Sequence, residues 1–339
     1  MRIGPVEIGE RTFVVAEIGG NHGGDPELAA RMIVEAAEAG ADAVKFQTYR
    51  AELLVHKGEE PLPHVRARYR TQQERFRSLE LKEEDYRRLA SLARSHGVVF
   101  FSTPFDEGSA DFLDEMVPAF KIASGDLTNL ALIRHVAKKG KPVIMSTGMA
   151  TVDEIRLAAR EVPEARLVLL HCVSAYPAPM EEANLRAIPF LKTAFPGVLI
   201  GYSDHTIGTL ACLGAVALGA VVIEKHFTTD KGEPIGDHKL SADFEDLKGL
   251  VRDIRALEAA LGTPSKEVGA SESRLRPAMR RGLAAARDLP TGTRIEPQML
   301  VPLRPLRGIP AEQIDQVVGK ALRRDVAEGE FLTREDVEW

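Results

Sequence analysis

The sequence predicts an α/β protein in which a closed (β/α)8 TIM barrel is followed by a small β-rich domain. Eight short apolar runs alternate with helical patterns between residues 12 and 261, and a polar, reactive side chain closes each run. The chain of 339 residues, 44% of them hydrophobic, is long enough for a barrel of about 250 residues and one further module. Because the carboxyl ends of parallel strands share one face of a barrel, we expect these polar side chains to gather at its mouth.

Each strand is predicted where one of the apolar runs falls. The strands lie at residues 12–16, 41–47, 98–101, 120–122, 142–145, 167–170, 198–200 and 220–224. Helices are predicted between them at 107–116, at 129–138 and from about Thr206, and another follows the last strand at 243–261. Three further helices have clearer signals. One begins at Asp25 and Pro26 and ends at Gly40, one is the amphipathic segment 82–96, and one starts at the capping box of Thr151–Glu154.

The last quarter of the chain differs in character from the barrel segment. Residues 262–273 are rich in Gly, Pro and Ser, which predicts a linker. We therefore divide the chain into a catalytic barrel at 1–262, a linker at 263–279 and a β-rich domain at 280–339. Within this last domain, Arg287-Asp288-Leu289 recurs as Arg324-Asp325-Val326, 37 residues later. Two copies are too few for a solenoid, so the echo favours a compact pseudo-symmetric module.

Composition limits the classes of partner. A net charge of −6 and a pI near 5.9 argue against nucleic acid, because a phosphate backbone requires clustered Lys and Arg. No apolar run approaches the roughly 20 residues of a membrane-spanning helix, and the first residues lack signal-peptide character. Only Cys172 and Cys212 are present, which excludes a disulfide framework. We expect a cytoplasmic protein without a membrane partner.

Two histidines end neighbouring predicted strands. His205 lies in Gly201–Thr206 and His226 in Glu224–Thr228, so their imidazoles could converge on one divalent metal ion at the mouth. A single strand-end histidine is more often structural. Two on adjacent strands, flanked by acidic and hydroxyl groups, favour a metal site. Neither cysteine is an obvious third ligand, and positions left for water and substrate oxygens suit Mn²⁺ or Mg²⁺ better than a closed zinc site.

Two strand lysines form a second group of candidates. Alternation along the strand places Lys45 and Gln47 on the same side. A lysine inside a strand is costly unless it is paired with an anion. Lys45 and Lys121 therefore predict a bound phosphate or carboxylate. The alternative is a structural ion pair with Glu17 or Glu224.

Strand-end hydroxyls and carboxylates complete the candidate site. Thr103, Ser124 and Ser146 mean little singly, but around two lysines they could form a phosphate cradle. Glu17, at the end of the first strand, could act as a general base, bind a sugar hydroxyl, or form a salt bridge to a lysine. Asp237, in the loop after the last strand, is by itself more typical of a turn-capping carboxylate.

Eight groups of residues at strand ends form a motif series. They are Glu17-Ile18-Gly19 with Asn21-His22, Lys45-Phe46-Gln47, Ser102–Asp106, Lys121–Ser124, Ser146–Met149, His171-Cys172 with Tyr176-Pro177, Gly201–Thr206 and Glu224–Thr228. In content and order this series resembles that of the N-acetylneuraminate (sialic acid) synthases. The resemblance runs from about residue 5 to the C-terminus, and residues 280–339 resemble the antifreeze-like (SAF, β-clip) domain of that family.

The resemblance implies a transferase that joins phosphoenolpyruvate, N-acetylmannosamine or a related N-acetylated aldose, and water. Carbon 3 of the enol phosphate would attack the open-chain aldehyde, and carbon–oxygen cleavage would release phosphate and a nine-carbon 2-keto sugar acid. A divalent metal would assist, Mn²⁺ first, with Mg²⁺ or Co²⁺ as alternatives. His205 and His226 would bind this metal.

The resemblance also assigns substrate contacts by position. Phosphoenolpyruvate would be held by Lys45, Thr103, Lys121, Ser124, Ser146, Ser174 and Ser203. The sugar or the metal-bound water would meet Glu17, Tyr176 and Asp237, of which Glu17 and Asp237 would be catalytic together with the two histidines. Gln47 is a further candidate for binding substrate. Arg304 matches an arginine that reaches into a partner subunit's barrel, which implies a domain-swapped homodimer.

Two positions depart from the pattern of many family members. Asn often stands at the position of Ser174, so that contact would be shorter or relayed by water. Gly often follows the Arg-Pro pair where this chain has Leu306, which bears on the placement of Arg304.

Several alternatives stay open. The acceptor could be a diacetamido-trideoxy hexose leading to legionaminic or pseudaminic acid, or a 6-phosphate sugar leading to sialic acid 9-phosphate. A 6-phosphate would need extra positive charge, for which Arg66, Arg68 and Arg70 are candidates, although a solvated face is the simpler interpretation. Other classes are a metal-dependent barrel aldolase or epimerase, which needs no enol-phosphate cradle, and a carbohydrate- or ice-binding protein with a degenerate barrel.

Overall fold

Eight parallel strands close into a barrel in the order β10-β3-β4-β5-β6-β7-β8-β9. They are β3 (Phe13–Gly19), β4 (Ala43–Thr48), β5 (Val99–Pro104), β6 (Phe120–Ile122), β7 (Val143–Ser146), β8 (Leu167–Cys172), β9 (Leu199–Asp204) and β10 (Val222–His226). This computed structural model describes residues 1–61, 66, 68–233 and 236–339, and divides into the units Met1–Gly262 and Thr263–Trp339. The predicted TIM barrel is confirmed.

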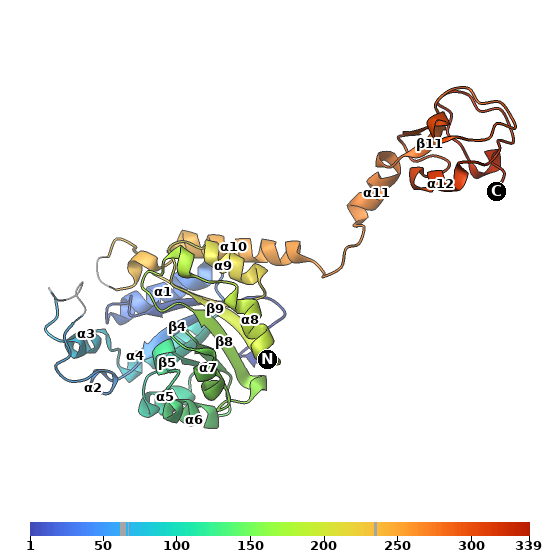
Figure 1. The fold of residues 1–339 in the computed structure, drawn as a ribbon. Helices are drawn as coiled ribbons and strands as arrows, with labels where there is room; N and C mark the ends of the chain where they lie inside the picture. Colours follow the sequence, from blue (N-terminus) through green and yellow to red (C-terminus); the bar gives the residue numbers. More distant parts are fainter. Residues whose placement is uncertain (62–65, 67, 234–235) are drawn as a thin grey trace. The chain divides into compact units, whose positions relative to one another are not determined.

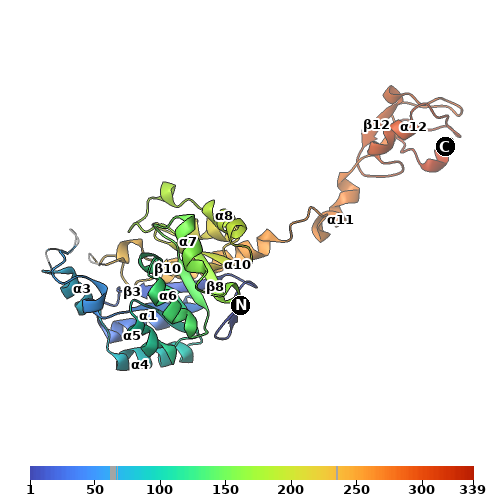
Figure 2. The ribbon, with the colours of Figure 1, turned by 60° about the horizontal axis from the view of Figure 1, so that its bottom comes forward.

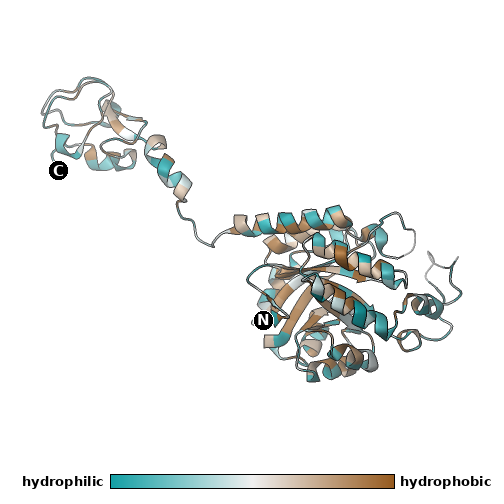
Figure 3. Ribbon diagram, turned by 180° about the vertical axis from the view of Figure 1, so that it is seen from behind, coloured by the Kyte–Doolittle hydropathy of each residue, from teal (hydrophilic) through white to brown (hydrophobic). Residues whose placement is uncertain are grey.

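Helices surround the strands of the first unit (Figures 1 and 2). They are α1 (Pro26–Glu38), α2 (Ala51–Leu54), α3 (Gln72–Leu79), α4 (Glu83–Ser95), α5 (Glu107–Asp114), α6 (Leu130–Lys138), α7 (Val152–Ala159), α8 (Ala187–Ala194), α9 (Leu210–Ala217) and α10 (Phe244–Leu261). Figure 3 shows hydrophobic colour over the barrel strands, whereas the helices carry both colours. This pattern is typical of strands buried on both faces and helices buried on one.

Local sequence signals explain where the helices start. The Asp25 side chain accepts a hydrogen bond from Glu27 N, and Pro26 occupies the first turn of α1. At α7 the predicted capping box forms, because Thr151 Oγ1 accepts from Glu154 N and Glu154 Oε2 accepts from Thr151 N.

None of the helices in the described residues combines the length and apolarity needed to cross a membrane.

Some predicted boundaries were wrong. Strands β9 and β10 run beyond 200 and 224 to Asp204 and His226, because cross-strand pairing with β8 and β3 supports their polar ends. Helix α9 starts at Leu210 and not near Thr206, whose N–H and C=O are bound by the side chains of Asp204 and Lys225. Helix α8, between β8 and β9, was not predicted, and neither were α2 and α3 in the long connection.

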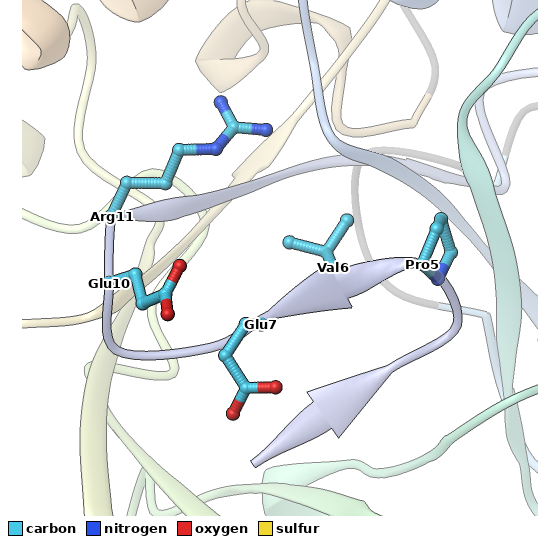
Figure 4. Close-up of a pocket in the computed structure, with 5 residues that line it drawn as sticks. All are labelled: Pro5, Val6, Glu7, Glu10 and Arg11. Atoms are coloured by element: carbon cyan, nitrogen blue, oxygen red, sulfur yellow. The ribbon is translucent and has the colours of Figure 1, made fainter.

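The amino-terminal end of the barrel is closed by a hairpin of β1 (Arg2–Ile3) and β2 (Val6–Glu7). Ile3 and Ile8 are buried in the main core. A hollow of about 400 Å³ beside this hairpin is lined by Pro5, Val6, Glu7, Glu10 and Arg11 (Figure 4). Two of its charged groups are already engaged, since Glu7 pairs with the chain's amino terminus and Arg11 pairs with Asp42.

The second unit has a core of its own around the antiparallel pair β11 (Gly282–Ala285) and β12 (Leu300–Leu303). The two copies of the repeated motif meet in this core. Leu289 and Val326 exchange two backbone hydrogen bonds of 2.8 Å, and Asp288 and Asp325 each accept from the backbone of the other copy. Segment 263–279, predicted as a linker, includes the helix α11 (Ala270–Met279). A short helix, α12 (Ile314–Val317), completes the unit.

Candidate active site

A network of four buried charged side chains lies inside the barrel at the carboxyl ends of the strands. Lys45 Nζ lies 2.7 Å from Glu17 Oε2 and 3.8 Å from Glu224 Oε2, and Lys121 Nζ lies 3.9 Å from Glu224 Oε1. All four side chains are at most 7% exposed. Gln47 donates to Glu17 Oε1 at 3.0 Å. The structural ion pairs considered as an alternative for the two lysines are therefore present.

The two carboxyl groups of this network have opposite pKa shifts. Burial raises the pKa of Glu17 to about 7, although Lys45 works against burial. Burial acts in the same direction on Glu224, but Lys121 and Lys45 outweigh it and lower its pKa to about 2. Burial lowers the pKa of Lys121, whereas the two carboxylates raise that of Lys45 despite burial. Divergent carboxyl pKa values are typical of acid–base sites.

Hydroxyl groups line the same space. Lys45 donates to Thr103 Oγ1 at 3.2 Å, and Lys121 donates to Ser146 Oγ at 2.7 Å. Ser203 donates to Glu224 Oε1 at 2.9 Å. The lysines and hydroxyls together form a set of donors that an anion could engage.

A close approach of the backbone adds to these donors. Gly148 N donates to Ser124 Oγ at 3.0 Å, and a Cβ on Gly148 would lie only 2.2 Å from Ser174 Oγ. Any larger residue at 148 would fill the space between the two serines. Within the described part of the chain, the buried Ser174 Oγ has no hydrogen-bond partner.

The two imidazoles lie side by side at the mouth. The ring centroids of His205 and His226 are 5.3 Å apart. His205 Nδ1 is held at 2.7 Å from the Val173 carbonyl oxygen, which leaves Nε2 for another ligand. His226 Nδ1 is buried and lacks a hydrogen-bond partner among the described residues. Burial, together with the neighbouring His205 and Lys45, holds the pKa of His226 well below its usual range, so the ring is neutral.

These features fit a divalent cation. A neutral imidazole with an unengaged buried nitrogen is a ready metal ligand, and a metal would satisfy that nitrogen. Asp237 Oδ2 lies 3.8 Å from His226 Nδ1. Across the described ranges, no set of three or more His, Cys, Asp or Glu side chains is arranged as a metal centre. The remaining ligands would therefore be water or substrate.

Asp237 is held in place by a loop network. Asn21 Nδ2 donates to the Phe227 carbonyl and to Ser241 Oγ, while Asn21 Oδ1 accepts from Asp237 N. Ser241 Oγ in turn donates to the Asp237 carbonyl at 2.7 Å. The Asn21 side chain thus ties the loop after β3 to the loop after β10.

Other predicted site residues differ in position. The Tyr176 ring lies against His205, with centroids 4.1 Å apart, and is 54% exposed. Arg304 is an exposed residue of the second unit, just after β12. His171, one of the polar strand-end residues, turns away from the mouth and lies 2.8 Å from the Ala183 carbonyl.

The arginines considered for a 6-phosphate group are already engaged in part. Arg66 pairs with Glu60 at 3.0 Å and also donates to the Pro61 carbonyl. The Arg68 guanidinium lies over the Tyr69 ring at 5.6 Å. Both arginines are exposed, as expected of a solvated face.

Three members of the site were missed or undervalued in the sequence. Glu224 was considered only as an ion-pair partner, although two-residue alternation places it on the same side of β10 as His226. Cys172 lies with its sulfur 3.7 Å from His205 Nδ1. Asn21 was noted only as part of a flexible loop. Its role depends on contacts more than 200 residues away in sequence, for which no local signal exists.

Known proteins match both units. The NeuB family model matches residues 32–266 and the SAF domain model matches residues 280–338. The chain is 43% identical to the N,N'-diacetyllegionaminic acid synthase of Legionella pneumophila over 96% of this chain and 94% of the relative. It is 37% identical to the N-acetylneuraminate-9-phosphate synthase of Mus musculus, over 96% and 92%.

A solved structure agrees with these matches. The crystal structure of N-acetylneuraminic acid synthetase from Leptospira borgpetersenii in complex with citrate superposes with a TM-score of 0.73 at 37% identity, covering 81% of this chain and 94% of that one. The predicted resemblance is confirmed at the level of family and domain. The chain belongs to the NeuB family and ends in a SAF domain.

Proposed function

We propose that this protein condenses phosphoenolpyruvate with an N-acetylated aldose, N-acetylmannosamine or a close relative, and water to give an N-acetylneuraminate-type acid and phosphate. One observation carries the proposal: two buried lysines with hydroxyl partners stand beside two adjacent imidazoles in one barrel mouth. Family relatives are named as synthases of legionaminic acid, pseudaminic acid and N-acetylneuraminate 9-phosphate. These are all acids of the same general kind.

The lysine network suits an anionic substrate. With Glu17 and Glu224 ionised, the four charges cancel. With Glu17 protonated, the site carries an excess positive charge. Among the described residues, Lys121 Nζ contacts only a hydroxyl and a carbonyl within 3.0 Å, and the Glu224 carboxylate lies 3.9 Å away. An enol phosphate would therefore replace weak neutral contacts of Lys121 with charge-assisted hydrogen bonds.

His205 and His226 would hold a divalent ion, Mn²⁺ in the first place and Mg²⁺ or Co²⁺ as alternatives. Such an ion supplies a Lewis acid for the aldehyde oxygen of the sugar. The Val173 carbonyl fixes the ring of His205, and Asp237 lies beside His226. These residues would orient the open-chain sugar for attack by carbon 3 of the enol phosphate.

The reaction also needs a group that accepts a proton from the attacking water. A carbon–carbon bond forms between carbon 3 of phosphoenolpyruvate and the aldehyde carbon, and water adds to carbon 2. The bond from carbon 2 to the phosphate oxygen breaks, and phosphate leaves. Glu17, with a pKa of about 7, can both hold and release a proton at neutral pH. Asp237 is the second candidate for orienting the water.

The acceptor sugar has a second candidate. The diacetyllegionaminic acid synthases match at 43% and 38% identity, against 37% for the N-acetylneuraminate-9-phosphate synthase of Mus musculus. A diacetamido-trideoxy hexose is therefore the alternative acceptor. The engagement of Arg66 and Arg68 by neighbours speaks against a phosphorylated sugar.

The assembly and location of the enzyme also belong to the proposal. Arg304, exposed on the SAF unit, would bind the N-acetyl group in the barrel of a partner subunit, so the active form would be a domain-swapped homodimer. The reaction would take place in the cytoplasm. Light scattering would test the dimer, since a monomer with full activity would exclude the exchange of Arg304.

A coupled phosphate-release assay tests the reaction. Purified protein would be given phosphoenolpyruvate, Mn²⁺ and one of three acceptors: N-acetylmannosamine, its 6-phosphate or a 2,4-diacetamido-trideoxy hexose. We expect phosphate release with an unphosphorylated acceptor and its loss with EDTA. Turnover that resists EDTA would refute the role of the histidines, and failure to bind phosphoenolpyruvate would favour the aldolase or epimerase.

A further inference from the structure

A second buried ion pair lies behind the two candidate metal ligands. Asp204 and Lys225 are 0% and 1% exposed, and Lys225 Nζ lies 2.8 Å from Asp204 Oδ2. The two residues are register partners on β9 and β10. Each directly precedes one of the histidines, His205 or His226.

This pair points away from the barrel interior. Ser203 and Glu224, one residue earlier on each strand, contact each other among the charges of the mouth. Because side chains alternate along a strand, Asp204 and Lys225 face outward. There Cys212 of α9 donates to Asp204 Oδ2 at 3.3 Å. The pair therefore makes no contact with a substrate bound inside the barrel.

The hydrogen bonds of the pair join the chain segments that carry the two imidazoles. Asp204 Oδ1 accepts from Tyr202 OH at 3.0 Å and from Thr206 N at 2.9 Å. Lys225 Nζ also donates to the Thr206 carbonyl at 2.5 Å. The residues on both sides of His205 are thus fixed to the residue before His226.

The two imidazoles depend on this network to different degrees. The ring of His205 has a second anchor, the Val173 carbonyl. The ring of His226 makes no hydrogen bond through either nitrogen in the part of the chain that the structure describes, so whichever nitrogen binds the metal, the other has no anchor. Metal-ligating histidines are usually oriented by an outer hydrogen bond on the second ring nitrogen. The position of His226 must therefore come from its backbone, which is held on one side by the pairing with β3 and by Ala242 N and on the other side through Lys225.

Stability alone does not explain a full ion pair at this place. Replacing a buried pair by apolar residues of similar volume is often neutral for stability. A pair that is saturated with hydrogen bonds does, however, restrict backbone movement on both strands. We infer that the Asp204–Lys225 pair is a positioning device that sets the separation of His205 and His226 for a divalent cation. The inference rests on the proposed function in so far as these histidines bind the metal.

The test is Mn²⁺ binding by the full-length protein, measured by isothermal titration calorimetry and electron paramagnetic resonance without substrates. In Asp204→Asn/Lys225→Met both charges disappear, so no unpaired buried charge remains. We expect this variant to fold and to bind Mn²⁺ about 10- to 100-fold more weakly, as for other changes behind metal ligands.

The chain offers a matched control. Asp42, at the opposite end of the barrel, pairs with Arg11 and Arg255 and accepts from Val14 N at 2.9 Å. The variant Asp42→Asn/Arg255→Met also removes a buried carboxylate and one of its two cations, and the remaining Arg11 is half exposed. We expect its Mn²⁺ affinity to equal that of the wild type, even if its melting temperature falls.

Each outcome has a distinct meaning. Wild-type Mn²⁺ affinity in folded Asp204→Asn/Lys225→Met overturns the inference and leaves the proposed function intact. No Mn²⁺ binding by the wild type, or binding that survives His226→Ala, contradicts the proposed metal site itself. If the double variant does not fold, Tyr202→Phe removes a single hydrogen bond to Asp204. A weaker Mn²⁺ affinity then supports the inference, and an unchanged affinity overturns it.

Discussion

The two ends of the barrel both bury charged residues but use them differently. At the amino-terminal end, the Asp42 carboxylate is paired with Arg11 and Arg255 and accepts a backbone N–H, so both of its oxygens are engaged. At the mouth, His226 Nδ1 and Ser174 Oγ are buried without hydrogen-bond partners among the described residues. Complete pairing is what stability requires, whereas unpaired polar atoms in a cavity await a ligand.

The largest expected effect comes from His226→Ala, which removes one imidazole from the mouth. We expect phosphate release to fall by more than about 100-fold, because loss of a ligand should exceed the effect of changes behind ligands. The protein should stay folded, since the substitution removes a group whose buried nitrogen lacks a partner in the described structure. Circular dichroism is the control. Substantial turnover by this variant would show that the imidazole at the mouth is not needed for the reaction.

Lys121→Met tests the anion site. The substitution keeps the length of the side chain but removes a donor to Ser146, while Lys45 remains near Glu224. A charge-assisted hydrogen bond corresponds to about 10- to 100-fold in affinity, so the KM for phosphoenolpyruvate should rise by about that factor. Arg134→Met, which removes an exposed pair with Glu161, is the control. An unchanged KM would mean that the lysine has only a structural role.

Asp42→Asn should affect stability and not chemistry. It weakens a fully engaged carboxylate, and we expect the free energy of unfolding to fall by about 2–3 kcal/mol. The kcat and KM of the folded fraction should equal the wild-type values, because the residue lies at the far end of the barrel. Urea unfolding and steady-state kinetics measure the two quantities. A changed KM in a fully folded Asp42→Asn variant would show that the amino-terminal end of the barrel also contributes to the chemistry.

The sequence was sufficient for the barrel and for the candidates on its strand ends, because strand alternation and apolar runs are local signals. Lys45 with Gln47, and His205 with His226, follow from that alternation. Contacts between side chains of different strands are less predictable. The approach of Glu17 to Lys45 and of Glu224 to both lysines depends on strand register and tilt, which no single segment encodes. Arg304 lies in a separate unit, so its part in the site stays a prediction.

A smaller effect is expected from pH. Glu17 has its pKa raised from 4.5 to about 7 in the folded protein, so the folded state binds this proton more tightly than the unfolded chain. The stability due to protonated Glu17 is therefore complete below pH 4.5 and is lost as the pH rises to 7. Compared with Glu17→Gln, the free energy of unfolding of the wild type should decline by up to about 1.4 kcal/mol per pH unit in that window.

The comparison with Glu17→Gln is needed because His226 titrates in the opposite sense. Its pKa is lowered in the folded protein, so its contribution to stability is lost as the pH falls. The difference between the two urea-unfolding series, recorded in EDTA, isolates Glu17. Parallel profiles between pH 4.5 and 7 would show that the carboxyl group is not perturbed.

The smallest expected effect is that of Ser174→Asn. Ser174 Oγ is buried and lacks a hydrogen-bond partner in the described residues, beside the close approach of Gly148. A longer amide could reach an anion directly, and one added hydrogen bond of about 1 kcal/mol would lower the KM for phosphoenolpyruvate about fivefold. Ser174→Ala, which removes the hydroxyl and should raise the KM by a similar factor, is the opposite comparison. If the asparagine variant instead raises the KM, the space between Ser124 and Ser174 is already filled by substrate, and the unpaired hydroxyl marks a steric limit of the site.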